Sequence, residues 1–320
     1  MRISGIISKI KVCKKIAISF HTSADGDSLG SALALLIGLR KLNKEVYIIS
    51  KEIIPQKFMF LPYSYEITGE LSEPLKDTDC IIVLDCGDFK RINANLSMQN
   101  RKFALINIDH HVSNDLYGDL NYIDTGASAV AEIVYEALTL LKVKIDSEIS
   151  ACLYTSLLTD TGSFRHSSTT AVTHSIAGEL INTGIDFSDI HRKVFENRKF
   201  EQIKFCGEII SNMTSELHGT VCVMYIPKNL IKKYNLESSD TADVVTLGSS
   251  INTVEVTIVI REAENGVKVS LRSKSIVDVR KIAEGFNGGG HIRAAGFFTE
   301  INFHDIKVKL LEILEKELIK

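Results

Sequence analysis

The chain has 320 residues, of which 45% are hydrophobic and 24% charged, and its formal net charge is −3. This length and composition are typical of a globular protein with room for two domains and a sizeable core. The slightly acidic balance excludes a protein that holds long duplex nucleic acid through a broad basic surface.

Short apolar runs alternate with helical patterns through the first half of the chain. The runs predict strands at 16–20, 46–49, 81–84 and 105–108, and the helical patterns predict helices at 28–42, 128–141 and 146–158. Apolar strands that alternate with helices indicate an α/β fold, with a mostly parallel sheet covered on both faces. In such sheets ligands bind beyond the carboxyl ends of the strands.

The pattern changes after residue 186. A helical and highly charged stretch continues to about residue 213, and then strands are predicted at 219–226, 254–261 and 267–272, with helices at 278–285 and 304–318. We interpret this half as a smaller α/β domain. The expected organisation is a first domain at 1–188, a helical linker at 189–213 and a second domain at 214–320.

The sequence carries neither a signal peptide nor an apolar stretch long enough to span a membrane. Its six cysteines lie mostly in apolar runs and form no C-x-x-C pair, which indicates buried, reduced thiols. We therefore expect a cytoplasmic protein that makes no contact with membranes.

Four polar clusters each begin where a predicted strand or helix ends. They are His21–Asp27, Asp85–Asp88, Asp109–His111 and Asp160–Gly162. Each cluster alone is typical of a turn, a polar loop or a helix end. Because all four occupy the same kind of position in one α/β half, we interpret them together as a single site.

The charges in this site indicate metal ions. Asp25, Asp27, Asp85 and Asp160 would place four carboxylates in one crevice, and their repulsion favours bound cations. Carboxylate oxygen together with imidazole suits Mn²⁺ better than a structural zinc site, while Mg²⁺ or Co²⁺ remain alternatives. Two such cations can clamp the attacking and leaving oxygens of a phosphoryl group.

A fifth element lies in the second half, where three consecutive glycines precede a histidine at Asn287–His291. Backbone N–H groups of glycines can converge on an anion, whereas a flexible surface loop is the alternative interpretation. The upstream segment Ser270–Ser273, which contains Arg272, favours phosphate binding.

The order of these five motifs resembles the DHH phosphoesterase superfamily, with the glycine-rich element similar to its DHHA1 substrate-binding domain. The resemblance extends from His21 to Gly296 and is greatest with the branch of bifunctional oligoribonucleases and pAp phosphatases, the nanoRNases. The segment Leu158–Arg165 carries much of that likeness. The resemblance to the superfamily implies an N-terminal DHH domain with a mostly parallel sheet flanked by helices, and a smaller C-terminal α/β DHHA1 domain.

The resemblance also implies roles for particular residues. One cation would be held by His21, Asp25 and Asp85, and the other by Asp27, Asp85, His110 and Asp160. His111 would contact the scissile phosphate, while Asp109 would orient a metal-ligating histidine through its other ring nitrogen. The substrate's other phosphate would be bound by residues of the second domain, namely Arg272, Gly288, Gly289, Gly290 and His291.

The implied function is a two-metal, Mn²⁺-dependent phosphoesterase that acts on RNA of two to a few nucleotides, on 3'-phosphoadenosine 5'-phosphate (pAp), or on both. A phosphodiesterase of linear or cyclic dinucleotides is the alternative enzyme, and a catalytically inactive nucleotide-binding regulator is the alternative of another class. A family II inorganic pyrophosphatase would lack the glycine-rich element. A homodimer is one option for the oligomeric state.

Overall fold

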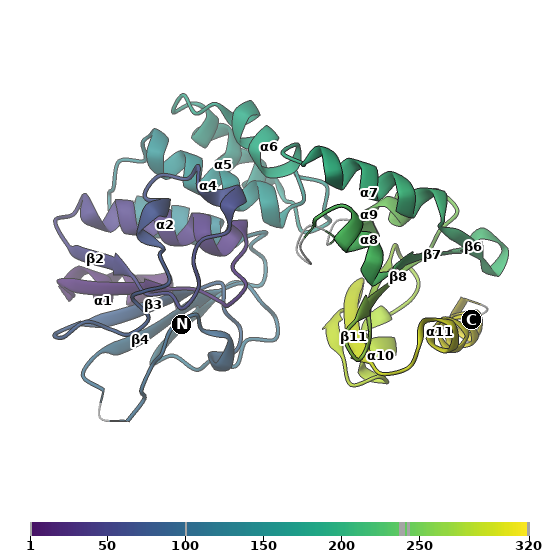
Figure 1. Cartoon of the computed structure of the whole chain (residues 1–320). Helices are drawn as coiled ribbons and strands as arrows, with labels where there is room; N and C mark the ends of the chain where they lie inside the picture. The colour runs from purple at the N-terminus through teal and green to yellow at the C-terminus, as the bar shows by residue number, and fades with distance from the viewer. Residues whose placement is uncertain (1, 100, 237–240, 242–243, 319–320) are drawn as a thin grey trace. The chain divides into compact units, whose positions relative to one another are not determined.

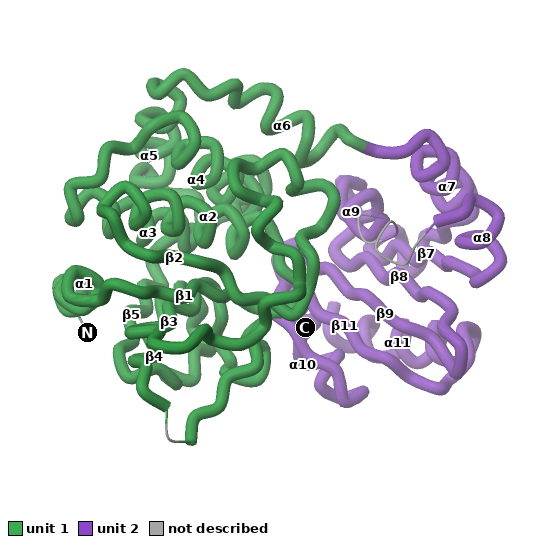
Figure 2. The backbone as a smooth tube through the Cα atoms, turned by 60° about the vertical axis from the view of Figure 1, so that its left-hand side comes forward, with its two compact units in different colours: residues 1–197 green, residues 198–320 purple. Residues whose placement is uncertain are grey.

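The computed structural model describes residues 2–99, 101–236, 241 and 244–318 (Figure 1). The chain divides into two compact units, Met1–Asn197 and Arg198–Lys320 (Figure 2). The segment expected to be a helical linker contains the greater part of helix α6 (Phe187–Phe195) and all of helix α7 (Phe200–Ser211).

Unit 1 is built on a five-stranded sheet in the order β2-β1-β3-β4-β5, and every neighbouring pair is parallel. Its strands are β1 (Lys15–Ser19), β2 (Glu45–Ile48), β3 (Cys80–Leu84), β4 (Ala104–Asp109) and β5 (Leu120–Ile123). All five residues of β3 are buried, as expected for a central strand covered on both faces. The predicted parallel α/β fold is therefore confirmed.

Helices cover one face of this sheet (Figure 1). The helices of unit 1, besides α6, are α1 (Ile3–Val12), α2 (Gly26–Arg40), α3 (Val130–Leu140), α4 (Ser147–Asp160) and α5 (Ala171–Ile181). Helix α2 is buried along almost its whole length and packs directly on α4. The close approach depends on Gly30, because a Cβ atom there would lie 2.4 Å from the carbonyl oxygen of Cys152.

The opposite face of the sheet packs against connecting segments. Side chains such as Ile81, Val83 and Leu105 form a buried cluster with Ile92 and Ala94. The short 3-10 helices η1 (Gln56–Phe58), η2 (Ser64–Glu66) and η3 (Phe89–Arg91) lie in these segments. The sheet is thus enclosed on both faces.

Unit 2 contains a six-stranded sheet in the order β10-β11-β9-β8-β7-β6, in which only the β7–β8 pair is parallel. The strands are β6 (Thr214–Glu216), β7 (Val221–Ile226), β8 (Val256–Ala263), β9 (Gly266–Ser273), β10 (Gly289–His291) and β11 (Ala294–Thr299). The helices besides α7 are α8 (Lys228–Lys233), α9 (Val244–Ser249), α10 (Val279–Glu284) and α11 (Phe303–Leu318), with a 3-10 turn η4 (Leu217–Gly219).

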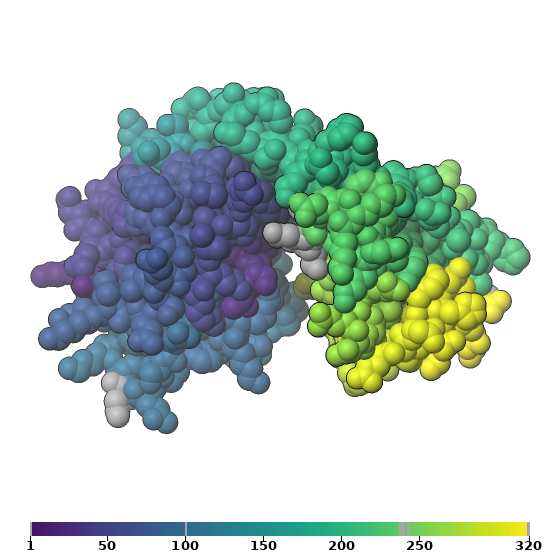
Figure 3. Space-filling model, in the orientation of Figure 1, coloured from purple at the N-terminus to yellow at the C-terminus, as the bar shows by residue number. Residues whose placement is uncertain are grey.

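Two hydrophobic clusters stabilise unit 2, one on each face of its sheet. Helices α10 and α11 cover one face, and α11 lies at the surface in yellow in Figure 3. Helices α7, α8 and α9 contribute to the cluster on the other face, over β7 and β8. No helix among the described residues is both long enough and apolar enough to cross a bilayer.

Candidate active site

His21 follows β1 closely, and its ring is held in one tautomer. Nδ1 lies 2.8 Å from the carbonyl oxygen of Thr22, to which it donates a hydrogen bond. In the neutral ring, Nε2 therefore carries the lone pair, and it faces Asp25 Oδ2 at 3.7 Å and Asp85 Oδ2 at 3.4 Å. This arrangement is the one that a metal-ligating imidazole requires.

Asp25 is the N-cap residue of α2. Its Oδ1 accepts a hydrogen bond of 3.0 Å from the Ser28 backbone N–H, while the Ser28 hydroxyl accepts one from the Asp25 N–H. This capping box fixes the carboxylate and satisfies helix-end donors. The other oxygen, Oδ2, remains directed at His21.

Asp27 lies in the first turn of α2, with a side chain that is 1% exposed. Its Oδ1 accepts hydrogen bonds from the hydroxyls of Ser31 and Ser156 and from the Ala131 N–H. Its Oδ2 accepts a hydrogen bond of 2.8 Å from the Val130 N–H. Asp27 therefore caps the N-terminus of α3, where a negative charge is favourable.

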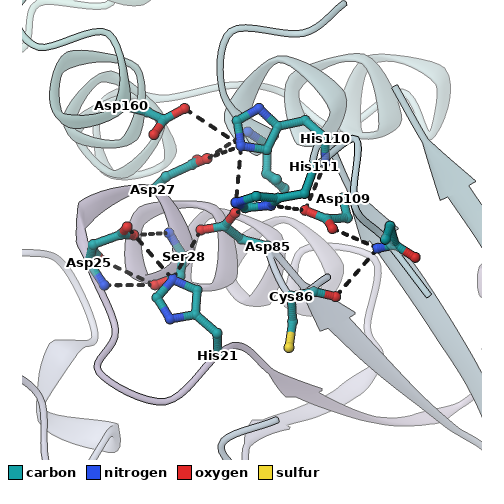
Figure 4. Close-up of polar contacts among 12 residues, drawn as sticks. His21, Asp25, Asp27, Ser28, Asp85, Cys86, Asp109, His110, His111 and Asp160 are labelled. Carbon is teal, nitrogen blue, oxygen red and sulfur yellow. Dashed lines mark hydrogen bonds and ion pairs between the residues drawn. The ribbon is translucent and has the colours of Figure 1, made fainter. Parts of the chain in front are cut away.

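Asp85 stands directly after β3 with a φ of 53°, in the left-handed region. Figure 4 shows its carboxylate between His21 on one side and His110 and His111 on the other. Oδ2 faces His21 at 3.4 Å, and Oδ1 faces His110 Nε2 at 3.7 Å. Oδ1 is buried and has no hydrogen-bond partner among the described residues. Burial of an unpartnered carboxylate oxygen lowers the stability of the fold unless a cation binds to it.

His110 and Asp160 complete this side of the cluster. His110 Nδ1 donates a hydrogen bond to the Ala127 carbonyl oxygen at 3.1 Å. Its Nε2 then faces three carboxylates, with Asp160 at 3.6 Å, Asp85 at 3.7 Å and Asp27 at 3.9 Å. Asp160 is the last residue of α4, two residues beyond the predicted helix end.

Asp109 ends β4 and is fully buried. Its Oδ1 lies 2.8 Å from both His111 Nδ1 and the His110 backbone N–H, and its Oδ2 accepts a hydrogen bond of 2.6 Å from Asn114 Nδ2. Asn114 Nδ2 also donates to Asn107 Oδ1 at 2.8 Å. The carboxylate therefore fixes the His111 ring, and Asn114 fixes the carboxylate.

The side chains form two sets with the spacing of metal ligands. The sets are His21, Asp25 and Asp85, and Asp27, His110 and Asp160, and within each set one ligand atom per residue lies within 4.8 Å of the others. A third set, Asp85, Asp109, His110 and His111, overlaps with both. The unpartnered Oδ1 of Asp85 lies between the first two sets, so the donor atoms fit two cations that share Asp85.

The charges of the cluster support the same interpretation. Burial lowers the pKa of His21, but the carboxylates of Asp25 and Asp85 outweigh it and raise that pKa to about 10. Burial likewise opposes protonation of His110, whose pKa nevertheless rises to about 9 beside Asp27, Asp160 and Asp85. Without a cation, these imidazoles therefore bind protons in its place.

The carboxylates show the complementary effect. Burial and the repulsion of Asp85 raise the pKa of Asp27 well above its usual range. Burial raises the pKa of Asp160 to about 6 against the opposing influence of His110. A cation between these groups would remove the repulsion and keep the carboxylates ionised.

The substrate-binding residues predicted for the second half all lie in unit 2. The glycines do not form an open loop, because Gly289 and Gly290 belong to strand β10, which pairs with β11 at the edge of the sheet. His291 is exposed at the end of that strand, and Arg272 lies half-buried in β9, where Nη1 donates to the Leu271 carbonyl oxygen at 2.9 Å.

Sequence reasoning did not identify the hydroxyls that hold Asp27. Ser31 follows Asp27 by four residues on a predicted helix, so this contact could have been read from the sequence. Ser156 lies on α4, and nothing in the linear sequence connects it with Asp27. Asn114 follows the histidine motif by three residues, but its hydrogen bond to Asp109 depends on how the folded chain places the loop.

Comparisons with known proteins show the family to which the chain belongs. Residues 15–157 match the model of the DHH family N-terminal domain, and residues 218–316 match that of the DHHA1 domain. The bifunctional oligoribonuclease and PAP phosphatase NrnA of Thermus thermophilus is 30% identical over 307 residues, which cover 95% of this chain and 90% of that protein. The protein of the same name from Bacillus subtilis is 29% identical, with 91% of each chain covered.

A solved structure is also similar over nearly the whole length. An exopolyphosphatase-related protein from Bacteroides fragilis has a TM-score of 0.91 and 27% sequence identity, with 99% of this chain and 97% of that chain covered. RecJ of Thermus thermophilus, crystallised with Mn²⁺, has a TM-score of 0.55 at 15% identity. The match covers 97% of this chain and 53% of RecJ, and the two proteins share the fold.

Proposed function

Because the chain belongs to the DHH family of phosphoesterases, in the branch of the bifunctional oligoribonucleases and PAP phosphatases, we propose that it hydrolyses RNA of two to a few nucleotides and pAp. The observation that carries this proposal is the position of Asp85 between two sets of ligand atoms, each of which contains a histidine and further carboxylates.

The two sets would hold two divalent cations. His21, Asp25 and Asp85 would bind one cation, and Asp27, Asp85, His110 and Asp160 the other. We propose Mn²⁺ as the preferred ion, because imidazole and carboxylate are combined in each set and no thiolate takes part. When bound, such a pair of cations supplies an activated water near neutral pH and neutralises phosphoryl charge.

His111 is the residue that we expect to contact the scissile phosphate. The hydrogen bond from His111 Nδ1 to Asp109 is the main cause that raises the pKa of His111. The imidazole would therefore carry a proton on Nε2 and donate it to a phosphoryl oxygen, or to the leaving oxygen. Asp109 itself remains ionised, because the hydrogen bonds from His111 and Asn114 outweigh its burial and lower its pKa.

Unit 2 would bind the part of the substrate remote from the cleaved bond. We propose that Arg272 and His291 contact a terminal phosphate, with Gly288, Gly289 and Gly290 allowing its close approach. A phosphate held in this way would favour very short chains, because the distance between the terminal phosphate and the cleaved bond is then limited. Residues 1–188 would act as the catalytic domain and residues 214–320 as the substrate-binding domain.

We also propose that the enzyme acts in the cytoplasm. All six cysteines are free thiols and five of them are buried, which suits a reducing compartment.

The experiment that tests this function uses protein that has been stripped with a chelator. It is incubated with 5'-labelled RNAs, from dinucleotides to chains of several tens of nucleotides, and separately with pAp, with and without added Mn²⁺. We expect metal-dependent release of mononucleotides, fastest from the shortest RNAs, together with hydrolysis of pAp. Cleavage of neither substrate with Mn²⁺, Mg²⁺ or Co²⁺ would contradict the proposal, and linear and cyclic dinucleotides would then be tested.

A further inference from the structure

One face of the sheet in unit 2 is only partly covered by helices. On β9, the side chains of Val267, Val269 and Leu271 are buried in the cluster formed with α10 and α11. Because side chains alternate along a strand, the residues between them point to the opposite face. The same alternation on β11 buries Ala295 and Phe297 on the helix side.

The residues that point the other way define what we call the β9–β11 face. They are Lys268, Ser270, Arg272, Ala294, Gly296 and Phe298. Strands β9 and β11 are hydrogen-bonded neighbours (Figure 2), and their register pairs Lys268 with Phe298, Ser270 with Gly296, and Arg272 with Ala294. Each pair consists of one polar or charged side chain on β9 and one apolar or small residue on β11.

Phe298 is the unusual member of this face. Its side chain is 51% exposed although it lies within a strand, and it stacks on no other aromatic ring among the described residues. The nearest residues of β11 on the same face as Phe298 are both small: Gly296 precedes Phe298 by two residues, and Ala294 precedes it by four. Small neighbours leave the ring accessible and leave room beside it for a flat ligand.

The charge of the β9–β11 face indicates what such a ligand carries. Lys268 is exposed beside Phe298 and forms no ion pair with any described residue, and Arg272 lies four residues further along β9. None of the six residues of the face is acidic. An aromatic ring interleaved with cations is the pattern of surfaces that bind single-stranded nucleic acid.

We propose that Phe298 is the platform on which a nucleobase of the substrate stacks, while Lys268 contacts the phosphate of the same nucleotide. This inference rests on the proposed function and deepens it, because it assigns base binding to a residue distinct from the phosphate-binding Arg272. The Phe298 and Arg272 positions are separated by about 13 Å along the strands, since each residue of a strand adds about 3.3 Å. The two side chains would therefore contact different parts of one short ligand.

Stacking on phenylalanine does not read base identity, because every base has a π-face. We accordingly expect the enzyme to prefer nucleotides over base-free phosphoesters without discriminating strongly among sequences. This expectation separates Phe298 from a residue that hydrogen-bonds to a particular base.

The test measures binding without turnover, on the full chain with the metals chelated. The probes are 5'-AMP and ribose 5-phosphate, which differ only in the base, and the method is titration calorimetry. We expect 5'-AMP to bind the unmodified chain more tightly than ribose 5-phosphate. Phe298→Leu should lower the affinity for 5'-AMP about tenfold and leave that for ribose 5-phosphate unchanged. Phe298→Tyr, which keeps the ring, should bind both probes like the unmodified chain.

Val308→Ala serves as the control, because Val308 is 43% exposed on α11, which covers the other face of the sheet. Equal binding of 5'-AMP by Phe298→Leu and the unmodified chain would overturn the proposal. An equal loss of affinity for both probes would also overturn the proposal. A changed oligomeric state of Phe298→Leu with unchanged 5'-AMP binding would overturn it too, and would identify the face as a protein interface.

Hydrolysis then separates this inference from the proposed function. A normal KM for dinucleotides in Phe298→Leu would overturn the platform while the phosphoesterase function stands. The opposite outcome is also distinguishable. If the unmodified chain cleaves neither RNA nor pAp, but Phe298→Leu binds 5'-AMP more weakly than the unmodified chain does, the platform is supported while the proposed function fails.

Discussion

Replacement of Asn114 by alanine tests how the predicted contact of His111 with the phosphate is maintained. The change removes the hydrogen bond of 2.6 Å to Asp109 Oδ2 and the bond of 2.8 Å to Asn107. Asp109 is fully buried, so its oxygen would lose a partner that water does not readily replace. Such a loss costs about 1–3 kcal/mol of the free energy of unfolding.

The effect on catalysis should exceed what this loss of stability explains. Without Asn114, the Asp109 carboxylate is held through Oδ1 alone, by the His110 N–H and His111 Nδ1. The His111 ring that it orients is then held less firmly. Loss of a residue that orients a catalytic or metal-binding histidine typically lowers activity about tenfold to a hundredfold. We therefore expect kcat for pAp to fall by that factor, with KM changing little.

The assay pairs steady-state kinetics on pAp with urea unfolding, and it includes Asn121→Ala as a matched control. Asn121 is likewise a hydrogen-bonded asparagine: its side chain accepts one bond from the Gly118 N–H and donates one to the Gly118 carbonyl oxygen, and it forms none with Asp109. The control should lose stability and retain kcat. If Asn114→Ala loses stability to the same extent as the control and retains full kcat, the orienting role of Asn114 is refuted.

Two further predictions concern the cations and the packing beneath them. Since metal ligation needs neutral imidazoles, and His21 and His110 have pKa values of about 10 and 9, Mn²⁺ binding at neutral pH should release protons. The affinity for Mn²⁺ should rise with pH up to about those values. Calorimetry in buffers of different ionisation enthalpy should show a binding enthalpy that depends on the buffer, and a binding enthalpy that is the same in all buffers would contradict the prediction. Gly30→Ala should destabilise unit 1 by about 1–3 kcal/mol, because the new methyl group meets the Cys152 carbonyl; unchanged urea unfolding would contradict the close packing of α2 on α4.

The sheet of unit 1 could be predicted from the sequence because its central strands are short, predominantly apolar runs. The carboxyl ends of parallel strands meet at one edge, so His21, Asp85 and Asp109 were expected to lie together, and they do. Strand β5 was missed because its four residues are only half-buried and carry no clear pattern.

The contacts that support the site could not be predicted in the same way. Asp27 is held by Ser156 from α4 and by the first N–H groups of α3, and these contacts depend on tertiary packing. Strands β10 and β11 were missed because glycine and alanine have low intrinsic preference for strands. Their pairing with each other and with β9 determines the conformation of this segment, and only that register places Phe298 beside Lys268.

The central claim is that Asp85 holds two cations at once, and metal stoichiometry tests it most directly. Mn²⁺ bound per chain is measured by equilibrium dialysis for the unmodified chain, for Asp85→Asn and for Asp88→Asn, with dinucleotide hydrolysis followed in parallel. Asp88 is a suitable control because its carboxylate caps η3. We predict that the unmodified chain and Asp88→Asn bind two ions and are active, whereas Asp85→Asn loses high-affinity binding of both ions and is inactive. Retention of two tightly bound ions by a folded Asp85→Asn protein would contradict the account.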